Sequence, residues 1–321
     1  MKNNLLGVRK ILISDRTHEV LEQRLREAGF EVSVEPDHDH ESLVKAAQGC
    51  DGLVVRSKVQ IDSTFIDRVP SLRCIGRVGA GMETIDVDYA EAHGVRCLNS
   101  PEGNRDAVGE HAMGLLLALF NHIARADAEV RQGLWQREAN RGLEIKGKTI
   151  GIIGFGNMGQ AFAQRLSGFG CKIVVYDKYK ELKDFKDLRD LKVVGLAELQ
   201  AEADVVSFHV PLTEETHHYL DAGFISRMAK PFYLINTARG AVVDTDALVE
   251  GLENGKVLGA ALDVLEYENM QADGLGDVPA SLQYLMRSSR TVLTPHVAGW
   301  TVESKYKLAA VLADKMIEVL K

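Results

Sequence analysis

Short apolar runs alternate with longer polar segments of helical spacing along the first hundred residues. The short runs are rich in Val, Ile and Leu or alternate with a period of two, which is typical of strands. Two of the polar segments end at a glycine, a residue that commonly terminates helices. The expected strands are Ile11–Ser14, Glu31–Glu35, Gly52–Val55, Arg73–Val78 and Val95–Leu98, and the expected helices include His18–Ala28 and Glu41–Gln48. This alternation predicts a small parallel α/β domain.

A long segment of helical character follows, from Asp106 to about Ala126. Its centre, residues 112–120, is apolar all round, which is typical of a helix buried in a core or at a subunit interface. The residues that come next, 131–146, are mostly polar, contain Trp135 and suit an arm or loop.

Strand-like and helix-like segments alternate again from Lys148 to Pro295. The expected strands are Thr149–Ile153, Ile173–Tyr176, Val193–Val194, Ala203–Val210, Phe232–Asn236, Val257–Leu265 and Thr291–Leu293, with helices at Leu196–Ala201, Asp221–Met228 and Asp246–Glu253. This pattern predicts a doubly wound nucleotide-binding domain. Within it we expect residues 266–290, which are polar and include Pro279, to form an irregular insert. Thr301–Leu320 has the spacing of a closing amphipathic helix.

A glycine motif lies between the first expected strand of this domain and a helix. The motif reads Gly154-Phe155-Gly156-Asn157-Met158-Gly159. In a dinucleotide-binding turn the first glycine permits the tight bend, the second lets the backbone approach a pyrophosphate, and the third allows close packing of helix and strand. The helix N-terminus then presents free N–H groups to the phosphates. The motif alone is not specific, but its strand–turn–helix context favours dinucleotide binding over a turn without a ligand.

Asp177 ends the second strand of this unit. A carboxylate at that place accepts hydrogen bonds from the adenosine ribose and repels a 2′-phosphate, so we expect NAD rather than NADP. The adjacent Lys178 keeps NADP open as an alternative, because a cation beside the acid can accept a 2′-phosphate.

Composition excludes several classes of function. The 38 basic and 46 acidic residues give a net charge of −8, which indicates neither a nucleic-acid partner nor a membrane partner. The cysteines are scattered without a CxxC pair, so we expect buried thiols in a reducing compartment and no metal site. The longest apolar run, Ala112–Phe120, is far shorter than the roughly 20 residues of a membrane span. With no signal-peptide pattern at the N-terminus, these features predict a cytoplasmic protein.

Polar residues of three kinds follow neighbouring strands after the glycine motif. Arg239 comes after the strand that ends at Asn236, Glu266 and Glu268 follow the next strand, and His296 follows the last one. Ligands of open α/β sheets bind beyond the carboxyl ends of the strands. A guanidinium, a carboxylate and an imidazole at that edge predict an acid–base site beside a nicotinamide.

Several ordered motifs together resemble the D-isomer-specific 2-hydroxyacid dehydrogenases over nearly the whole chain. They are the glycine motif, SFHVPLTEET at 207–216, NTARG at 236–240, AALDVLEYE at 260–268 and TPHVAGW at 294–300. The resemblance implies a Rossmann-type doubly wound parallel sheet domain, residues 101–296, inserted in a smaller flavodoxin-like α/β substrate domain. That substrate domain would comprise residues 1–100 and 297–321. We also expect a homodimer formed through residues 106–146, because the apolar centre of that region suits a subunit interface.

The resemblance also implies roles for individual residues. Arg239 would bind the substrate carboxylate, His296 would be the general acid–base, and Glu268 would pair with His296 and hold one tautomer. Glu266 is close enough in sequence to take the place of Glu268, and the family's usual Phe and Pro are replaced here by Leu265 and Asn269. The cofactor-binding residues would be Gly154, Phe155, Gly156, Asn157, Met158, Gly159, Asp177, His209, Val210, Pro211, Thr216, Thr237, Ala238, Asp263, His296 and Gly299. We expect His217 and His218 to be solvated loop residues.

The segments Val55-Arg56-Ser57 and Gly76-Arg77-Val78-Gly79-Ala80-Gly81 resemble the substrate-domain motifs of short D-3-phosphoglycerate dehydrogenases without a C-terminal regulatory domain. The substrate-binding residues would be Arg56, Ser57, Arg77 and Gly79, together with Arg239. Paired arginines suit a phosphate, which favours 3-phosphoglycerate and a role in serine biosynthesis. Trp300 stands where the family usually has a small residue. A glyoxylate/hydroxypyruvate reductase and, from another class, an NADH-sensing protein similar to transcriptional corepressors are the alternatives.

Overall fold

The computed structural model describes residues 9–180, 191–269, 274–275 and 278–321. The chain forms two compact units. Unit 1 comprises Met1–Asn104 and Trp300–Lys321, and unit 2 comprises Arg105–Gly299. Both boundaries lie a few residues later than the positions expected from the sequence, which were after residues 100 and 296.

Unit 1 is built on a parallel sheet of five strands in the order β2-β1-β3-β4-β5. This is the strand order of flavodoxin-like folds, as expected. The strands are β1 (Lys10–Ile13), β2 (Glu31–Val34), β3 (Gly52–Val55), β4 (Cys74–Arg77) and β5 (Arg96–Asn99). Each lies within two residues of the run expected from the sequence.

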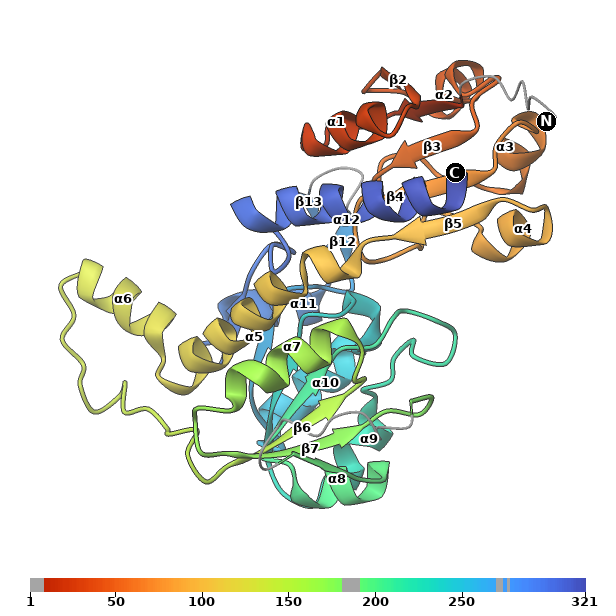
Figure 1. The fold of residues 1–321 in the computed structure, drawn as a ribbon. Helices are drawn as coiled ribbons and strands as arrows, with labels where there is room; N and C mark the ends of the chain where they lie inside the picture. The colour runs from red at the N-terminus through yellow and green to blue at the C-terminus, as the bar shows by residue number, and fades with distance from the viewer. Residues whose placement is uncertain (1–8, 181–190, 270–273, 276–277) are drawn as a thin grey trace. The chain divides into compact units, whose positions relative to one another are not determined.

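Helices pack on this sheet, and the last one comes from the end of the chain (Figure 1). They are α1 (Val20–Glu27), α2 (His40–Ala46), α3 (Ser63–Arg68), α4 (Val87–Ala92), the 3₁₀ turn η1 (Pro101–Gly103) and α12 (Val302–Leu320). Helices α3 and α4 were not expected from the sequence, because helices of six residues are too short to show a clear period. On α12, Leu312 and Met316 are fully buried, and Met316 Sδ lies 2.8 Å from where a Cβ on Gly76 of β4 would stand. The C-terminal helix therefore completes the core of unit 1.

Unit 2 contains a parallel sheet of seven strands in the order β14-β11-β10-β9-β6-β7-β8. The strands are β6 (Thr149–Ile153), β7 (Lys172–Tyr176), β8 (Leu191–Val193), β9 (Val205–Phe208), β10 (Phe232–Asn236), β11 (Val257–Leu262) and β14 (Thr291–Leu293). Counted from β6, this is the 3-2-1-4-5-6 order of a dinucleotide-binding fold with one more strand. The expectation of a Rossmann-type doubly wound sheet is confirmed, and the strand order reverses between β6 and β9.

The helices of unit 2 correct two expectations. They are α5 (Arg105–Phe120), α6 (Ile123–Arg131), α7 (Asn157–Leu166), α8 (Leu196–Glu202), α9 (Ala222–Arg227), α10 (Thr245–Glu253) and α11 (Ala280–Arg287), with a 3₁₀ turn η2 (Gly240–Val242) and a small hairpin of β12 (Glu268–Asn269) and β13 (Gly274–Leu275). The prediction of a single helix from residue 106 to about residue 126 is wrong, because two helices, α5 and α6, occupy this segment. The segment breaks at His122, whose φ of 52° is left-handed. The prediction that residues 266–290 form an irregular insert is also wrong in part, because α11 forms within this segment and buries Leu282 and Leu285.

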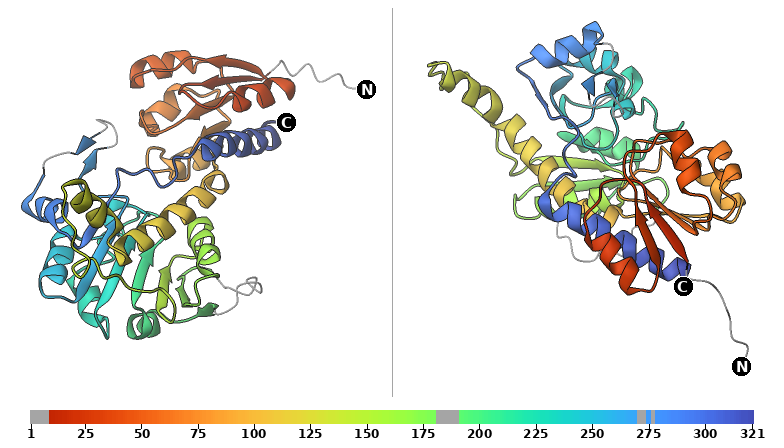
Figure 2. Two further views of the ribbon diagram at one scale, coloured as in Figure 1. Left: turned by 90° about the vertical axis from the view of Figure 1, so that its left-hand side faces the viewer. Right: turned by 90° about the horizontal axis from the view of Figure 1, so that it is seen from above.

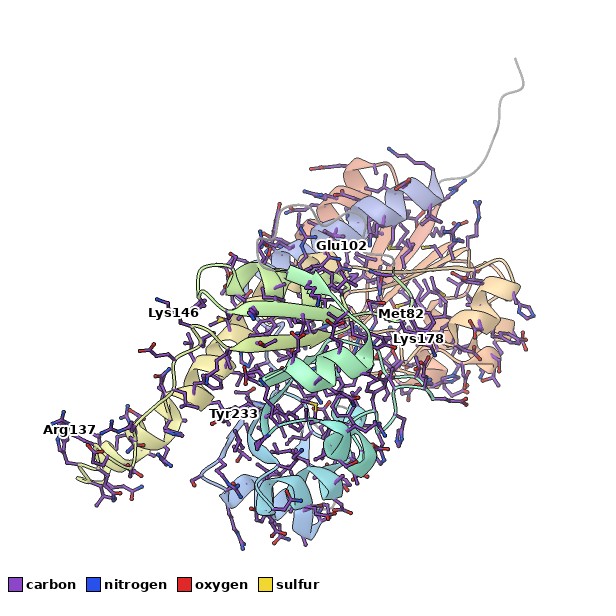
Figure 3. The ribbon with its side chains drawn as sticks, turned by 90° about the horizontal axis from the view of Figure 1, so that it is seen from below. Met82, Glu102, Arg137, Lys146, Lys178 and Tyr233 are labelled. Carbon is purple, nitrogen blue, oxygen red and sulfur yellow. The ribbon has the colours of Figure 1, made fainter. Side chains whose placement is uncertain are left out.

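An arm extends from the sheet of unit 2. Helix α6 has no buried residue and projects away from the strands (Figure 2), and residues 132–148 after it contain neither helix nor strand. Figure 3 shows Arg137 at the far end of this arm. Within the part of the chain that the structure describes, no single helix is long and apolar enough to cross a membrane; α5 and α6 meet that criterion only together, bent by 61°.

Helix α5 is held firmly against α7, the helix that follows the glycine motif. A Cβ on Gly109 of α5 would lie 2.8 Å from the backbone of Ala161 on α7, so only glycine permits this approach. Next to this contact Arg165 of α7 donates to the Asp106 carboxylate at 2.9 Å. The contact fixes α5 to the helix that begins at the glycine turn.

Candidate functional site

The glycine motif forms the turn between β6 and α7. Gly154 has a left-handed φ of 88°, and a Cβ there would lie 2.6 Å from the carbonyl oxygen of His209. A Cβ on Gly159 would lie 2.1 Å from the oxygen of Gly154, so this position also requires glycine. A Cβ on Gly156, by contrast, would have only Lys180 Nζ within 4 Å among the described residues. The first and third glycines therefore serve packing, and the second leaves open space over the turn.

This open space lies at the N-terminus of α7. Gly156 is the N-cap residue, and it has no side chain to accept from the N–H groups of the first turn. Asn157 and Met158 begin the helix, and Phe155 is fully buried beneath it. Unsatisfied N–H groups, the positive end of the helix dipole and a position without a Cβ fit a pyrophosphate. This chain therefore has the donor set that a dinucleotide requires.

Asp177, at the end of β7, organises the rim of the turn. Its Oδ2 accepts from Phe155 N at 2.7 Å, and its Oδ1 accepts from the backbone N–H groups of Tyr179 and Lys180 at 3.0 and 3.1 Å. The carboxylate thus joins the glycine turn to the segment after β7. Asp177 is the carboxylate that was expected from the sequence to face the adenosine ribose.

Lys178 does not present an isolated positive charge. Its Nζ donates to the Glu215 carboxylate, to which the Tyr179 hydroxyl also donates. The hydrogen bond with Glu215 raises the pKa of Lys178 and lowers that of Glu215. A cation that is paired in this way attracts a 2′-phosphate less, and Glu215 adds a second carboxylate near Asp177.

The loop after β9 carries four of the expected cofactor residues. His209 Nε2 lies 2.8 Å from the Ser207 hydroxyl, and Val210 packs against the main core of unit 2. The Thr216 hydroxyl donates to the carbonyl of Pro211 at 2.6 Å and closes the loop. His209 Nδ1 is buried and has no hydrogen-bond partner among the described residues. Such an orphaned polar atom beside the glycine turn is available to a ligand.

Of the two histidines expected to be solvated loop residues, His217 is exposed, whereas His218 is only partly exposed and has a carboxylate partner. His218 has a left-handed φ of 50°, and its Nε2 lies 2.7 Å from Glu266 Oε1. Glu266 Oε2 also accepts from the backbone N–H and the hydroxyl of Thr245, at 3.1 and 2.6 Å. Glu266 is therefore engaged with the start of α10 and with the loop after β9.

Arg239 lies in the turn that follows β10. The Asn236 side chain holds this turn, since Nδ2 donates to Arg239 O at 2.9 Å and Oδ1 accepts from Ala238 N at 3.0 Å. Arg239 Nη1 donates to the carbonyl of Ala238 at 2.7 Å, which orients the guanidinium. Thr237 Oγ1 is buried with no hydrogen-bond partner among the described residues. It is a second orphaned group at this edge of the sheet.

His296 pairs with Glu268 and not with Glu266. The distance from His296 Nδ1 to Glu268 Oε1 is 3.0 Å, and both side chains remain partly exposed. A carboxylate can only accept, so Nδ1 carries a proton and Nε2 is left to exchange one. His296 has a left-handed φ of 53°, which is uncommon for a residue with a Cβ. A backbone in this state is maintained by its surroundings.

Asp263, at the end of β11, provides much of that support. Its carboxylate accepts from the Thr294 hydroxyl at 2.6 Å, Val297 N at 2.9 Å and Ala298 N at 2.8 Å, while its backbone oxygen accepts from His296 N at 2.7 Å. Burial favours the neutral acid, but hydrogen bonds from His111, Thr294 and the two backbone N–H groups outweigh it, and the pKa of Asp263 is lowered.

His111 and Thr294 were not among the site residues expected from the sequence. Thr294 is the first residue of the quoted TPHVAGW motif, to which Gly299 also belongs. His111 directly precedes the apolar centre of α5. The only signal in the sequence was Asp263 itself, an acid at the end of an apolar strand that would need hydrogen-bond donors if it were buried. Which residues donate to it can be seen only in the folded structure.

The expected substrate residues lie at strand ends of unit 1. Arg56 and Ser57 follow β3, and the Arg56 guanidinium lies 5.6 Å from the ring centroid of Trp300. Among the described residues, no carboxylate forms an ion pair with Arg56. The side chain of Arg77, at the end of β4, covers Gly79, because a Cβ there would lie 2.2 Å from Arg77 Nη1.

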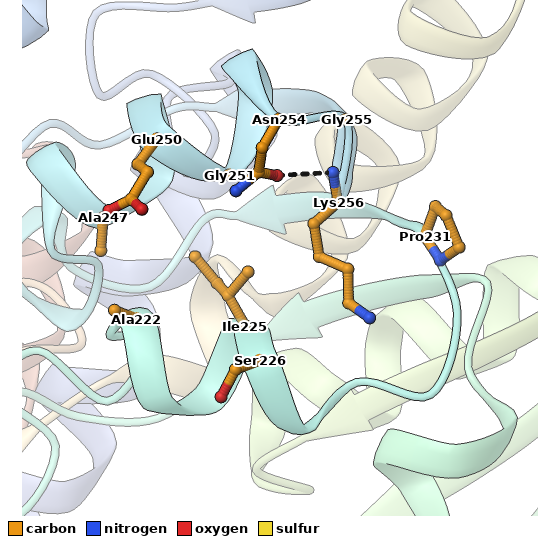
Figure 4. A pocket seen from close by; sticks show the side chains of 10 residues that line it. All are labelled: Ala222, Ile225, Ser226, Pro231, Ala247, Glu250, Gly251, Asn254, Gly255 and Lys256. Atoms are coloured by element: carbon orange, nitrogen blue, oxygen red, sulfur yellow. Dashed lines mark hydrogen bonds between the residues drawn. The ribbon is translucent and has the colours of Figure 1, made fainter.

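An open cavity of about 480 Å³ lies elsewhere in unit 2, between α9 and α10 (Figure 4). Pro231 and Lys256 line it, and these residues precede β10 and β11. The cavity is thus at the amino ends of the strands, opposite to the edge that carries Arg239 and Asp263. Within the described part of the chain, no three His, Cys, Asp or Glu side chains gather as metal ligands.

Comparisons with known proteins agree with this arrangement. Residues 113–298 match the family described as D-isomer specific 2-hydroxyacid dehydrogenase, NAD binding domain. The chain is 37% identical to a hydroxypyruvate reductase of Thermotoga maritima, over 90% of this chain and 92% of the relative. It is 33% identical to a D-3-phosphoglycerate dehydrogenase of Archaeoglobus fulgidus over 97% of this chain, but spans only 57% of that relative. A solved D-lactate dehydrogenase of Aquifex aeolicus, complexed with NAD and lactic acid, is similar with a TM-score of 0.81 and 28% identity, over 97% of this chain and 94% of that one.

The buried nitrogen of His209 predicts a pH-dependent stability. One edge of the residue reaches solvent, but protonation would place a charge on the buried Nδ1, and burial lowers the pKa of His209 to about 3. Between this pH and the value of about 6.5 in an unfolded chain, only the unfolded chain binds the proton. The contribution of neutral His209 to the free energy of unfolding is therefore complete above pH 6.5 and is lost as the pH falls towards 3.

In urea unfolding between pH 4.5 and 6, we expect His209→Gln to show a weaker pH dependence of the free energy of unfolding, by up to about 1.4 kcal/mol per pH unit. The control is His93→Gln, since His93 is exposed. If the free energy of unfolding depended on pH equally in the wild type and in His209→Gln, the lowered pKa of His209 would be contradicted.

Proposed function

Since the chain belongs to the D-isomer-specific 2-hydroxyacid dehydrogenase family, we propose that it transfers a hydride between NAD and C2 of a short D-2-hydroxy acid or the corresponding 2-keto acid. The observation that carries the proposal is the 3.0 Å pair of His296 Nδ1 and Glu268 Oε1 at the strand edge that also carries Arg239. An imidazole oriented by a carboxylate, with Nε2 left for proton exchange, suits general acid–base catalysis.

NAD would be held by groups that the chain already provides. The N-terminus of α7 and the open face of Gly156 would take the pyrophosphate, and Asp177 would face the adenosine ribose. His209 Nδ1 and Thr237 Oγ1, both buried without a partner among the described residues, would be satisfied along the cofactor. The pairing of Lys178 with Glu215 supports NAD over NADP.

The bound cofactor would supply or accept the hydride at C4 of its nicotinamide. Arg239 would grip the substrate carboxylate with its planar fork, which the hydrogen bond from Nη1 to Ala238 O already orients. His296 Nε2 would protonate the C2 oxygen during reduction and remove the same proton during oxidation. Glu268 would hold Nδ1 protonated throughout and stabilise the imidazolium form.

For the substrate we propose 3-phosphoglycerate and its 2-keto product, which would give the enzyme a role in serine biosynthesis. The support is Arg56, a cation at the end of β3 that has no carboxylate partner among the described residues. Hydroxypyruvate or glyoxylate is the second candidate. It is favoured by the match to the Thermotoga hydroxypyruvate reductase over 92% of that protein, whereas the chain spans only 57% of the Archaeoglobus phosphoglycerate dehydrogenase.

We further propose that the chain forms a homodimer through residues 106–146. The arm exposes apolar side chains that a second copy would cover, and Ile123, Val130 and Trp135 are 53%, 52% and 78% exposed. An amphipathic helix without a buried residue is seldom left in water.

The acid–base role of His296 is tested by His296→Asn, because asparagine tolerates the left-handed backbone and lacks the imidazole. Turnover of 2-keto acids with NADH should fall by about 100-fold or more, while the dissociation constant of NADH, measured by fluorescence, should stay within about twofold. His93→Asn, in unit 1, serves as the control. An unchanged turnover number would remove His296 as the acid–base. Wild-type protein that binds NADH but turns over no acid in a panel of phosphorylated and plain substrates would instead leave a dinucleotide-sensing role.

The phosphate proposal is tested by Arg56→Gln in steady-state kinetics with 3-phosphohydroxypyruvate and glyoxylate. Loss of a charged hydrogen bond should lower kcat/KM for the phosphorylated substrate by about tenfold or more. The value for glyoxylate should change by less than about threefold. Arg73→Gln replaces an exposed arginine of the same unit and is the matched control. Equal losses on both substrates would argue against a phosphate site at Arg56.

The dimer is tested by light scattering on the purified chain. We expect twice the 35.3 kDa mass of one chain, and a shift towards that single mass when Ile123→Glu and Trp135→Glu place charges on the arm. A wild-type protein with the mass of one chain at micromolar concentration would refute this interface.

A further inference from the structure

We propose that His111 on α5 is a positioning residue for the hydride-transfer reaction, because it holds the Asp263 carboxylate and Thr294 and thereby the loop that carries His296. His111 Nε2 lies 3.0 Å from Thr294 Oγ1 and 3.3 Å from Asp263 Oδ1. The inference rests on the function proposed above, since it concerns the group assigned there as the acid–base.

The hydrogen positions follow from counting donors. Thr294 has one hydroxyl hydrogen, and the 2.6 Å distance to Asp263 Oδ1 shows that it is donated to the carboxylate. The Thr294 oxygen can therefore act only as an acceptor towards His111. His111 Nε2 must carry a hydrogen, which it shares between Thr294 Oγ1 and Asp263 Oδ1. The structure thus assigns His111 a definite donor role.

Asp263 transmits this contact to His296. The backbone oxygen of Asp263 accepts from His296 N, and the carboxylate accepts from Val297 N and Ala298 N. One residue thus binds three successive N–H groups of the loop. Because His296 has a φ of 53°, the loop conformation depends on such contacts.

The burial of Asp263 makes each donor important. The residue is 1% exposed, and a buried carboxylate is costly unless hydrogen bonds satisfy it. His111 supplies one of the donors from a helix that Gly109 fixes against α7. Without His111, Oδ1 would keep Thr294 Oγ1 and Val297 N as donors but would lose the third, and Thr294 would lose the donor to its oxygen. We expect the carboxylate to shift as a result, and the backbone of residues 296–298 to shift with it. The pair of His296 Nδ1 and Glu268 Oε1 would then lose its alignment.

A role confined to stability makes different predictions. If His111 only satisfied a buried acid, its removal would lower the melting temperature but leave kcat of the folded enzyme intact. A positioning residue affects kcat more than cofactor binding, because a displacement of about 1 Å at an acid–base group can cost up to about 100-fold in rate. A replacement that restores the donor should also restore kcat.

The kinetic experiment compares His111→Leu with His111→Gln in the full chain, using NADH and the best 2-keto acid of the panel. We expect His111→Leu to lower kcat about tenfold with the dissociation constant of NADH within about twofold. His111→Gln, whose amide can donate near the position of Nε2, should recover kcat to within about threefold of the wild type. Thr294→Val should resemble His111→Leu, and the double variant should lose less than the product of the two single losses.

Three kinetic results would overturn the inference. They are a kcat of His111→Leu within twofold of the wild type, a His111→Gln variant as impaired as His111→Leu, and a loss that resides entirely in NADH binding. Each would show that the donor at this position does not act on the reacting group.

Imidazole NMR of ¹⁵N-histidine protein gives a readout that does not require turnover. We expect a proton on His111 Nε2, and a change in the His296 ring signals in His111→Leu but not in His111→Gln. The inference would be contradicted if the His111 ring were protonated only at Nδ1, or if the His296 ring signals were the same in His111→Leu as in the wild type. Absence of turnover in the wild type, by contrast, would contradict the proposed function and leave this NMR test in force.

Discussion

A buried carboxylate at the end of β11 is the constraint on which the candidate site depends. Asp263 is 1% exposed and stays charged only because Thr294, Val297, Ala298 and His111 surround it with donors. The need to satisfy that charge draws together a helix, a strand end and the loop after β14. The left-handed backbone of His296 is held by the same contacts, so the position of the proposed acid–base group depends on a buried acid.

The parallel sheet of unit 2 determines which groups can meet. Reversal of the strand order between β6 and β9 leaves the glycine turn and the His209 loop on adjacent strand ends. On the other side, β10, β11 and β14 lie next to one another and deliver Arg239, Glu268 and His296 to the same edge. The same topology thus joins a dinucleotide cradle to a set of acid–base groups, an arrangement suited to the hydride transfer that we propose.

Periodicity predicted most strands and failed where local signals were weak. Continuous helical spacing past residue 120 concealed the break at His122, and the polar composition of residues 266–290 concealed α11, which is held by only a few buried side chains. Within the site, spacing in the sequence could not choose between Glu266 and Glu268. The fold separates them, because Thr245 and His218 engage Glu266 while Glu268 meets His296.

The sequence alone determined the fold class, the family and the NAD cofactor, because these depend on local patterns. The patterns are alternating apolar runs, a glycine turn whose first and third positions exclude a larger residue, and an acid at the end of β7. Tertiary structure decided the partners of each charged group. Lys178 is paired with Glu215, His218 with Glu266 and His111 with Asp263, and the last two pairs join residues 48 and more than 100 positions apart. Such contacts depend on which strand ends the sheet brings side by side, and no short segment of sequence contains that information.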